Sequence, residues 1–203
     1  MKQRLQLLAC VAAFLCTLPA HAQFQLGAYV GAARTGDSSL FVFQPRVTSL
    51  EFRGVQYRDR SFEWPLYYGV RGAYFPGERF GFEAEFIHMK VHAATERTVQ
   101  GGGTLNGSTI QHSGPLSDYV QRFSISHGLN MILGNLVIRQ EFFRNTYSPG
   151  WLIVSGRVGL GGTISHAETE IFGVVDQGYQ SGGGVVQLAI GPEMRLWRNL
   201  HLL

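Results

Sequence analysis

Histidines, serines and carboxylates are the side chains of this chain whose types and spacing could do chemistry. Ser126 and His127 are neighbours, and a histidine base beside a serine is the pairing that activates a hydroxyl nucleophile. Successive side chains of a β-strand point to opposite faces, so on a strand this pair is not expected to bond. His127 is therefore predicted to be an interfacial residue at the edge of an apolar surface.

The segment 165–170, Ser-His-Ala-Glu-Thr-Glu, is a better candidate for acid–base chemistry. His166 and Glu168 lie two residues apart and would share one face of a strand. A histidine beside a carboxylate can act as a general base that its neighbour orients. The alternative is an ordinary polar rim, which the sequence favours because no further catalytic motif accompanies the segment. No catalytic residue is predicted, and the chain is predicted not to be an enzyme.

The remaining histidines and the glycine runs do not indicate a cofactor. His88 and His92 are four residues apart, a spacing that lets two histidines share one metal ion only on a helix. On a strand they would stand about 13 Å apart. Gly182-Gly183-Gly184 lacks the Lys-Ser/Thr that follows the glycines of a phosphate-binding loop. No metal site and no cofactor are predicted.

Charged side chains form a second set of candidates, in which charges of opposite sign are expected to pair. The set comprises Arg71, Glu83, Glu85, Arg157, Glu193 and Arg195. All six lie on the small or polar face of predicted strands, where an isolated buried charge would cost several kcal/mol. A tight turn at Pro76-Gly77 sets Arg71 level with Glu83 and Glu85, and Glu193 is expected to serve Arg157 and Arg195. Since three positive charges meet three negative ones, a neutral network is predicted.

The elements that position these residues are predicted from an alternation of apolar and polar residues. It recurs in the segments 24–32, 66–74, 80–88, 123–133, 152–164 and 186–196. The apolar positions are even-numbered in five of them and odd-numbered in 123–133. Among these positions only His88 and His127 are polar, and none is charged. A period of two indicates strands, and these are long enough for tilted strands to cross a bilayer.

The polar face of these strands separates two all-β architectures. It is rich in Gly, Ser and Ala, whereas the water-facing side of a soluble β-sandwich usually carries many charged residues. Small residues suit a narrow interior, and a transmembrane barrel turns its apolar side chains outward to lipid. The sequence therefore favours an antiparallel, up-and-down transmembrane β-barrel, with a secreted sandwich as the alternative.

Composition supports this class and excludes others. Gly accounts for 26 of 203 residues and charged residues for only 15%, against the ~25% charged residues of ordinary soluble domains. This does not describe a helical bundle or a disordered chain. The formal net charge of +3 comes with no basic run, so nucleic acid is not an expected partner.

Residues 1–22 are predicted to be a cleaved signal peptide. A basic start with Lys2 and Arg4 precedes an apolar stretch, and Ala20-His21-Ala22 has the small residues of a cleavage site. Cys10 and Cys16 both lie in this segment, so residues 23–203 contain no cysteine for a disulfide or thiolate site. Those residues are predicted to form the barrel domain.

The connections between the predicted strands alternate between short and long. Short turns are expected at 75–79 and 197–199, and a somewhat longer link at 142–150. Long polar stretches lie at 35–65, 93–119 and 167–184. Of these, the middle stretch 93–119, which contains Gly101-Gly102-Gly103 and Asn106-Gly107, is expected to be mobile. The segment 50–57 is strand-like and is expected to extend the sheet above the membrane. Short turns on one side and long loops on the other are typical of outer-membrane barrels.

With these features the chain resembles the small eight-stranded outer-membrane barrels, the broad family that includes the transmembrane domain of outer-membrane protein A. The resemblance rests on the signal, on FQLGAYVG at 24–31, YGVRGAYF at 68–75 and FEAEF at 82–86. It implies the bacterial outer membrane of a Gram-negative cell, reached through the periplasm, and as partners outer-membrane lipid, lipopolysaccharide and the barrel-assembly machinery. The family ends in a strand with a terminal aromatic residue, whereas this chain stops at Leu200-His201-Leu202-Leu203.

Bacterial barrels have an even number of strands, at least eight. Six strands and the start of a seventh are expected here, so about two C-terminal strands are predicted to be missing. The expected function is that of a structural, anchoring or surface-interaction protein, or of a very narrow porin-like pore, with loop ligands left open. The alternatives are a lipid A-modifying hydrolase, since some outer-membrane barrels place His, Ser and an acid at their outer surface, and a secreted binding module.

Overall fold

The structure is a computed structural model that describes residues 23–197 and 200–202. The predicted signal peptide, residues 1–22, lies outside the described residues. Within them the regular structure is β-strand apart from one short 3-10 helix, η1 (Leu116–Asp118). The all-β class and its antiparallel pairing are thus confirmed. Among the described residues, no helix is long and apolar enough to cross a membrane.

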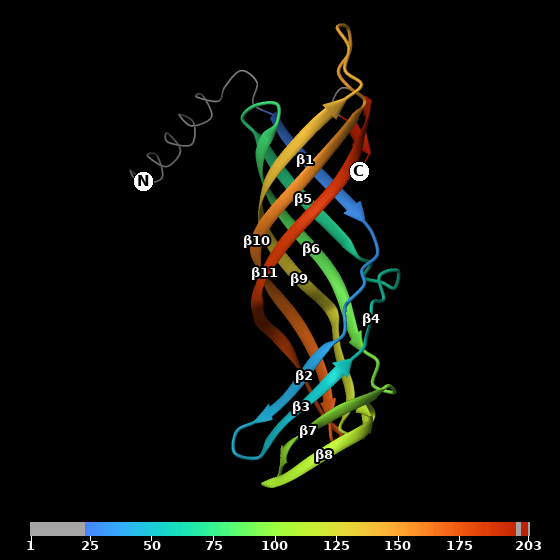
Figure 1. Cartoon of the computed structure of the whole chain (residues 1–203), viewed down its shortest axis with the longest axis vertical. Helices are drawn as coiled ribbons and strands as arrows, with labels where there is room; N and C mark the ends of the chain where they lie inside the picture. Colours follow the sequence, from blue (N-terminus) through green and yellow to red (C-terminus); the bar gives the residue numbers. More distant parts are fainter. Residues whose placement is uncertain (1–22, 198–199, 203) are drawn as a thin grey trace, which may run out of the picture.

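The main sheet is a long, strongly twisted and curved layer of antiparallel strands (Figure 1). Its strand order is β1-β5-β6-β9-β10-β11-β12, with β4 paired to β6. These strands are β1 (Gln23–Val30), β4 (Tyr57–Arg58), β5 (Tyr68–Phe75), β6 (Phe80–Ala93), β9 (Val120–Phe142), β10 (Leu152–Ile171), β11 (Val174–Trp197) and β12 (Leu200–Leu202). All six predicted strands belong to this sheet.

Within the residues that the structure describes, the sheet is not closed into a barrel, which differs from the expected ring of strands. β1 and β12 stand at opposite ends of the strand order. In the described part of the chain β1 pairs only with β5, and β12 only with β11. Both strands nevertheless line one cavity of about 1010 Å³ on the concave side. The curvature thus brings the two edges to the same cavity without hydrogen bonds between them.

A second, four-stranded sheet lies at one end of the molecule (Figure 1). Its order is β2 (Ser38–Gln44), β3 (Thr48–Val55), β7 (Thr98–Leu105) and β8 (Ser108–Pro115). The stretch 93–119, expected to be a mobile loop, instead contains β7 and β8, and Gly101-Gly102-Gly103 forms part of β7 beside β3. At Gly103, φ is +140° and an added Cβ would lie 2.0 Å from the carbonyl oxygen of Ser49. This glycine therefore allows close approach of two strands.

The largest apolar core fastens this small sheet to the main one. Phe52 and Val55 of β3 are fully buried with Leu116 of η1 and Val120 of β9. Phe123 of β9 and Ile171 of β10 pack against the same cluster. The small sheet is therefore attached through an apolar contact with the start of β9 and the end of β10.

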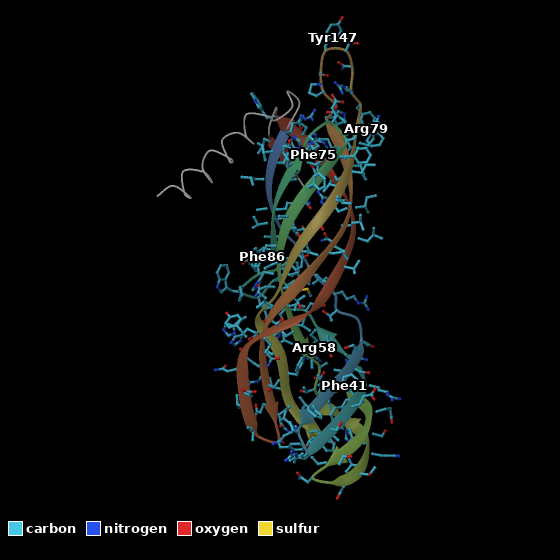
Figure 2. The ribbon with its side chains drawn as sticks, turned by 90° about the vertical axis from the view of Figure 1, so that its left-hand side faces the viewer. Phe41, Arg58, Phe75, Arg79, Phe86 and Tyr147 are labelled. Atoms are coloured by element: carbon cyan, nitrogen blue, oxygen red, sulfur yellow. The ribbon has the colours of Figure 1, made fainter. Side chains whose placement is uncertain are left out.

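The segment 167–184, expected to be a long loop, is instead a β-hairpin. β10 and β11 stay paired from Leu152↔Met194 to Ile171↔Val174, with one irregularity near Gly162. Phe172 and Gly173 form the turn with positive φ angles of 52° and 76°, which suits a tight two-residue hairpin. Figure 2 shows the two ends of the molecule, with Phe41 and Arg58 toward the small sheet and Phe75, Arg79 and Tyr147 at the opposite end.

The two faces of the main sheet differ in character, and β9 presents the opposite face from the predicted one. Leu133 is 2% exposed and Ile132 is 55% exposed, whereas the alternation put Leu133 outward. Leu133 pairs with Glu85 of β6, so odd-numbered residues of β9 here face the concave side. Both parities of 132–138 carry large apolar residues. The pairing with β6, rather than the local pattern, therefore determines which face is buried.

Candidate functional site

Two groups of polar side chains are candidates for function, and the first is a buried charge network on the concave face. Arg157 of β10 is at its centre. Its Nε donates to Glu83 of β6 at 3.0 Å, and its Nη2 donates to Glu193 of β11 at 3.2 Å. All three residues are buried. Arg157 thus bridges one carboxylate from β11, the neighbour of its own strand, and one from β6, which is not a neighbour of β10.

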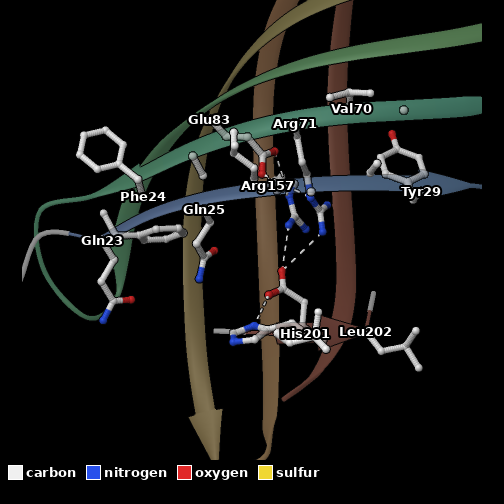
Figure 3. A pocket seen from close by; sticks show the side chains of 18 of the residues that line it. Gln23, Phe24, Gln25, Tyr29, Val70, Arg71, Glu83, Arg157, His201 and Leu202 are labelled. Carbon is white, nitrogen blue, oxygen red and sulfur yellow. Dashed lines mark hydrogen bonds and ion pairs between the residues drawn. The ribbon is translucent and has the colours of Figure 1, made fainter. Parts of the chain in front are cut away.

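Arg71 of β5 closes this arrangement (Figure 3). Its Nε lies 3.8 Å from Glu83 Oε2, and its Nη2 lies 3.5 Å from Glu193 Oε1. Two guanidinium groups and two carboxylates therefore alternate around a four-membered ring. Such a ring lets each charge neutralise two others, which offsets the loss of water around it.

Neutral side chains extend the network to Glu85 of β6. The side-chain amide of Asn135 donates to Glu83 at 3.0 Å and to Glu85 at 3.1 Å. The hydroxyl of Tyr29 on β1 donates to the other oxygen of Glu85 at 2.7 Å. Sequence reasoning missed Asn135 because it ended this strand at 133 and assigned its faces the other way round.

Arg195 does not join the network. It binds Glu141 of β9 and the carbonyl oxygen of Gly150 at 2.9 Å, near the end of β10. The described network thus holds two arginines against three glutamates, a formal charge of −1 rather than the predicted neutrality. His201 of β12 lies 3.6 Å from Glu193, and in its protonated form it would supply the missing positive charge.

The network forms one wall of the cavity between β1 and β12. Arg71, Glu83, Arg157 and Glu193 line it together with residues of β1 and β12 (Figure 3). Toward the C-terminal end of β9, Arg139 is buried, with its guanidinium 3.8 Å from the centre of the Phe75 ring. Beside this cavity, the concave side of the sheet therefore carries ion pairs in its middle and a guanidinium over an aromatic ring toward one end.

The second group gathers Ser126 and His127 of β9 with His166 and Glu168 of β10. Ser126 Oγ lies 3.0 Å from His127 Nδ1, and that nitrogen lies 2.9 Å from Glu168 Oε1. Ser126 also donates to the same carboxylate oxygen. The expectation that Ser126 and His127 could not bond was wrong.

A β-bulge explains this contact. Three residues of β9, Ser126, His127 and Gly128, lie opposite the single residue Lys90 of β6. Gly128 has a φ of +114°, and an added Cβ there would lie 2.3 Å from the His88 ring. A bulge re-aims side chains locally, which puts two adjacent side chains on one face.

The ring of His166 is held between two other aromatic rings. It makes edge contacts with His127 at 4.8 Å and with Tyr179 of β11 at 4.7 Å, measured between ring centres. Its Nδ1 is buried and has no hydrogen-bond partner among the described residues. Donation from Ser126, with His127 and His166 nearby, outweighs burial and lowers the pKa of the Glu168 carboxyl below its usual range.

This group does not form a nucleophile–base–acid relay. In such a relay the serine and the acid bond opposite nitrogens of the histidine, whereas Ser126 and Glu168 both approach Nδ1 of His127. His88 is separate from the group: it stacks on Tyr68 and its Nδ1 contacts Asn130 Oδ1 at 2.9 Å. No family model matches the chain, and no significant match was found among curated proteins or solved structures.

Proposed function

We propose that this chain is an outer-membrane protein of the β-barrel type, with an anchoring or surface-interaction role. The observation that carries the proposal is the inversion of the two faces of the main sheet. Arginines and glutamates pair on the concave side, while large apolar side chains stand exposed on the convex side. These include Phe82, Leu136, Val158, Leu160, Val186, Leu188 and Ile190.

An exposed apolar surface of this extent is unfavourable in water and is typical of lipid contact. A soluble β-sandwich would turn these residues into a core between two sheets. The only large apolar core of the described residues lies instead beneath the small sheet. The surface formed by Phe82, Leu136, Val158, Leu160, Val186, Leu188 and Ile190 is hereafter the apolar belt.

The proposal assigns the small sheet to the outside of the cell. The long connections between β1 and β5 and between β6 and β9 both lie at that end, as does the β10–β11 turn. The short β5–β6 turn lies at the opposite end, near Arg79 (Figure 2). Long external and short periplasmic connections are the usual asymmetry, and partners would meet the small sheet rather than the interior.

The ion-pair network supports an anchor rather than a pore. In a confined interior, bridged arginine and glutamate side chains close the path to ions. We expect the wild-type protein to be nearly silent in planar bilayers, and Arg71→Ala or Glu83→Ala to produce openings. Large, stable and ion-selective openings in the wild type would contradict an interior closed by the ion-pair network.

The primary test is fractionation of cells that express the full chain. The protein is expected in the outer-membrane fraction, with β-type circular dichroism in detergent and heat-modifiable gel mobility. A protein that is monomeric and soluble without detergent would contradict the proposal and favour the secreted binding module.

Hydrolysis of an outer-leaflet lipid is the second candidate. The gathering of a serine, two histidines and a carboxylate, Ser126, His127, His166 and Glu168, favours it, although the contacts of His127 do not form a relay. The group lies just beyond the exposed Ile164 on β10, at the edge of the apolar belt. Mass spectrometry of lipid A from cells expressing the wild type, Ser126→Ala or His166→Ala tests this. Identical lipid A in all three, and in cells without the protein, would eliminate it.

A further inference from the structure

The side chains of His127, His166 and Glu168 converge in an arrangement that suits metal binding as well as acid–base chemistry. Each of the three offers one ligand atom, and these atoms lie within 4.8 Å of one another. Among the described residues this is the one group of three or more His, Cys, Asp or Glu side chains so arranged. We propose that these three residues bind a single Zn²⁺-class transition-metal ion.

The ligand atoms need only small shifts to hold an ion, since they already lie within 4.8 Å of one another. Ligand atoms of a tetrahedral zinc site, at about 2.0–2.1 Å from the metal, stand about 3.3 Å apart. His127 Nδ1 and Glu168 Oε1 are already 2.9 Å apart. The His166 ring, in edge contact with His127, completes the set by a rotation about its side-chain bonds.

An unused donor at this place is the independent observation in favour of a ligand. Nδ1 of His166 is buried and lacks a hydrogen-bond partner among the residues that the structure describes. A buried polar atom without a partner costs about 1–3 kcal/mol. A metal ion bound at Nδ1 would accept the lone pair of this nitrogen and remove that cost.

The donor set selects the kind of metal. Two imidazoles and one carboxylate suit zinc, copper or nickel, whereas magnesium and calcium prefer oxygen ligands. Three protein ligands leave a fourth position for water or an external oxygen. The hydroxyl of Ser126 donates to Glu168 and thereby orients the carboxylate, in the manner of outer partners of metal ligands.

The β-bulge is what makes the site possible. Without it, His127 would follow the alternation of β9 and point away from Ser126. With it, two strands contribute ligands on one face, His127 from β9 and the pair His166 and Glu168 from β10. The inference does not rest on the proposed function, since these contacts exist in any medium that keeps the two strands paired.

The test is calorimetric titration of the full chain in detergent, after treatment with a chelator and without an affinity tag. One Zn²⁺ per chain is expected, with no comparable binding of Mg²⁺. His127→Ala, His166→Ala and Glu168→Gln each remove a ligand and should each weaken Zn²⁺ binding by more than about 100-fold. Ser126→Ala removes only an outer partner and should weaken binding by about 10–100-fold. His112→Ala on β8 is the matched control and should bind as the wild type does.

Failure of the wild type to bind Zn²⁺, or unchanged binding in all three ligand variants, would overturn the inference. Circular dichroism of each variant checks its fold. If the variants do not fold, Co²⁺ replaces them as a probe of the wild type: tetrahedral absorption bands support the site, and an octahedral spectrum alone contradicts it. A hydrolase without metal is a separate outcome, in which Ser126→Ala abolishes lipid cleavage while Zn²⁺ binding is absent.

Discussion

At the scale of single residues, the guanidinium of Arg157 holds together two strands that are not neighbours. It binds Glu83 of β6 and Glu193 of β11, whereas its own strand β10 pairs with β9 and β11. The contact therefore crosses the concave side of the sheet. Removing one partner of such a buried pair leaves an uncompensated charge, which costs more than the pair itself contributes.

We expect Arg157→Ala to lower the free energy of unfolding by about 3–5 kcal/mol, because the buried Glu83 and Glu193 would then share a single arginine, Arg71, at the longer distances of 3.8 and 3.5 Å. Arg53→Ala is the control, since its pair with Glu51 is exposed and such pairs contribute about 0–1 kcal/mol. Urea unfolding in detergent, followed by tryptophan fluorescence, measures both. Equal losses in the two variants would contradict the role assigned to the network.

Gly103 gives a second expectation for a single residue. Gly103→Ala should destabilise the small sheet by about 1–3 kcal/mol, because a non-glycine residue is strained at φ +140° and its Cβ would strike Ser49. Gly36→Ala is the control, since nothing lies within 4 Å of an added Cβ there. Limited proteolysis of the β7–β8 hairpin measures the effect, and equal digestion rates in both variants would contradict it.

At the scale of strands, alternation predicted which segments form the main sheet, and pairing decided their faces. The strands beginning near Phe24, Tyr68 and Phe80 follow their local pattern, with small or charged residues on one parity. In β9 both parities carry large apolar residues between Ile132 and Ile138, so the local pattern is ambiguous. The bulge at Ser126 was equally invisible, because it is defined by the residues of β6 and β10 that face it.

The cost expected of a charged substitution in the apolar belt depends on the medium. Leu160 of β10 is 68% exposed, so Leu160→Arg should be tolerated in water but should cost about 2–4 kcal/mol near a bilayer midplane. Tyr147→Arg, at the tip of the β9–β10 connection (Figure 2), should cost little in either medium. The folded fraction in lipid vesicles, scored by heat-modifiable mobility, measures this. Full insertion of the Leu160→Arg variant would argue against lipid contact at this strand.

At the scale of the whole molecule, the small sheet is the part that sequence reasoning missed. Its strands contain Gly101-Gly102-Gly103 and few alternating apolar residues, and β-propensity depends on the packing context rather than on composition alone. Only Phe52 and its neighbours on β3 carried a strand signal. The charge network was predicted more fully, since four of the six proposed residues meet in one ring, Glu85 joins through Asn135, and Arg195 pairs elsewhere.

The connection between β9 and β10 allows a test of the whole architecture. A protease that cuts near Tyr147, which is 97% exposed, would separate β10, β11 and β12 from the strands before them. Because β10 pairs with β9 from Leu152↔Phe142 onward, the two fragments should stay associated in detergent under native conditions. Gel filtration after cleavage measures this, and separation of the fragments without denaturant would contradict the extensive pairing.

The pairing of β3 with β7 bears on the order in which the chain folds. These strands come from two different connections, and their pairing runs from Thr48↔Leu105 to Arg53↔Gln100. Closing so long a stretch of flexible chain is slow and entropically costly, unless the β5–β6 hairpin between them has formed first and brought its ends together. The small sheet should therefore assemble late, and only on a hairpin of correct register. In refolding experiments, protection of β7 amides from hydrogen exchange is expected to lag behind that of β5 and β6. The pairing of β3 with β7 would then act as a kinetic checkpoint on the register of the β5–β6 hairpin.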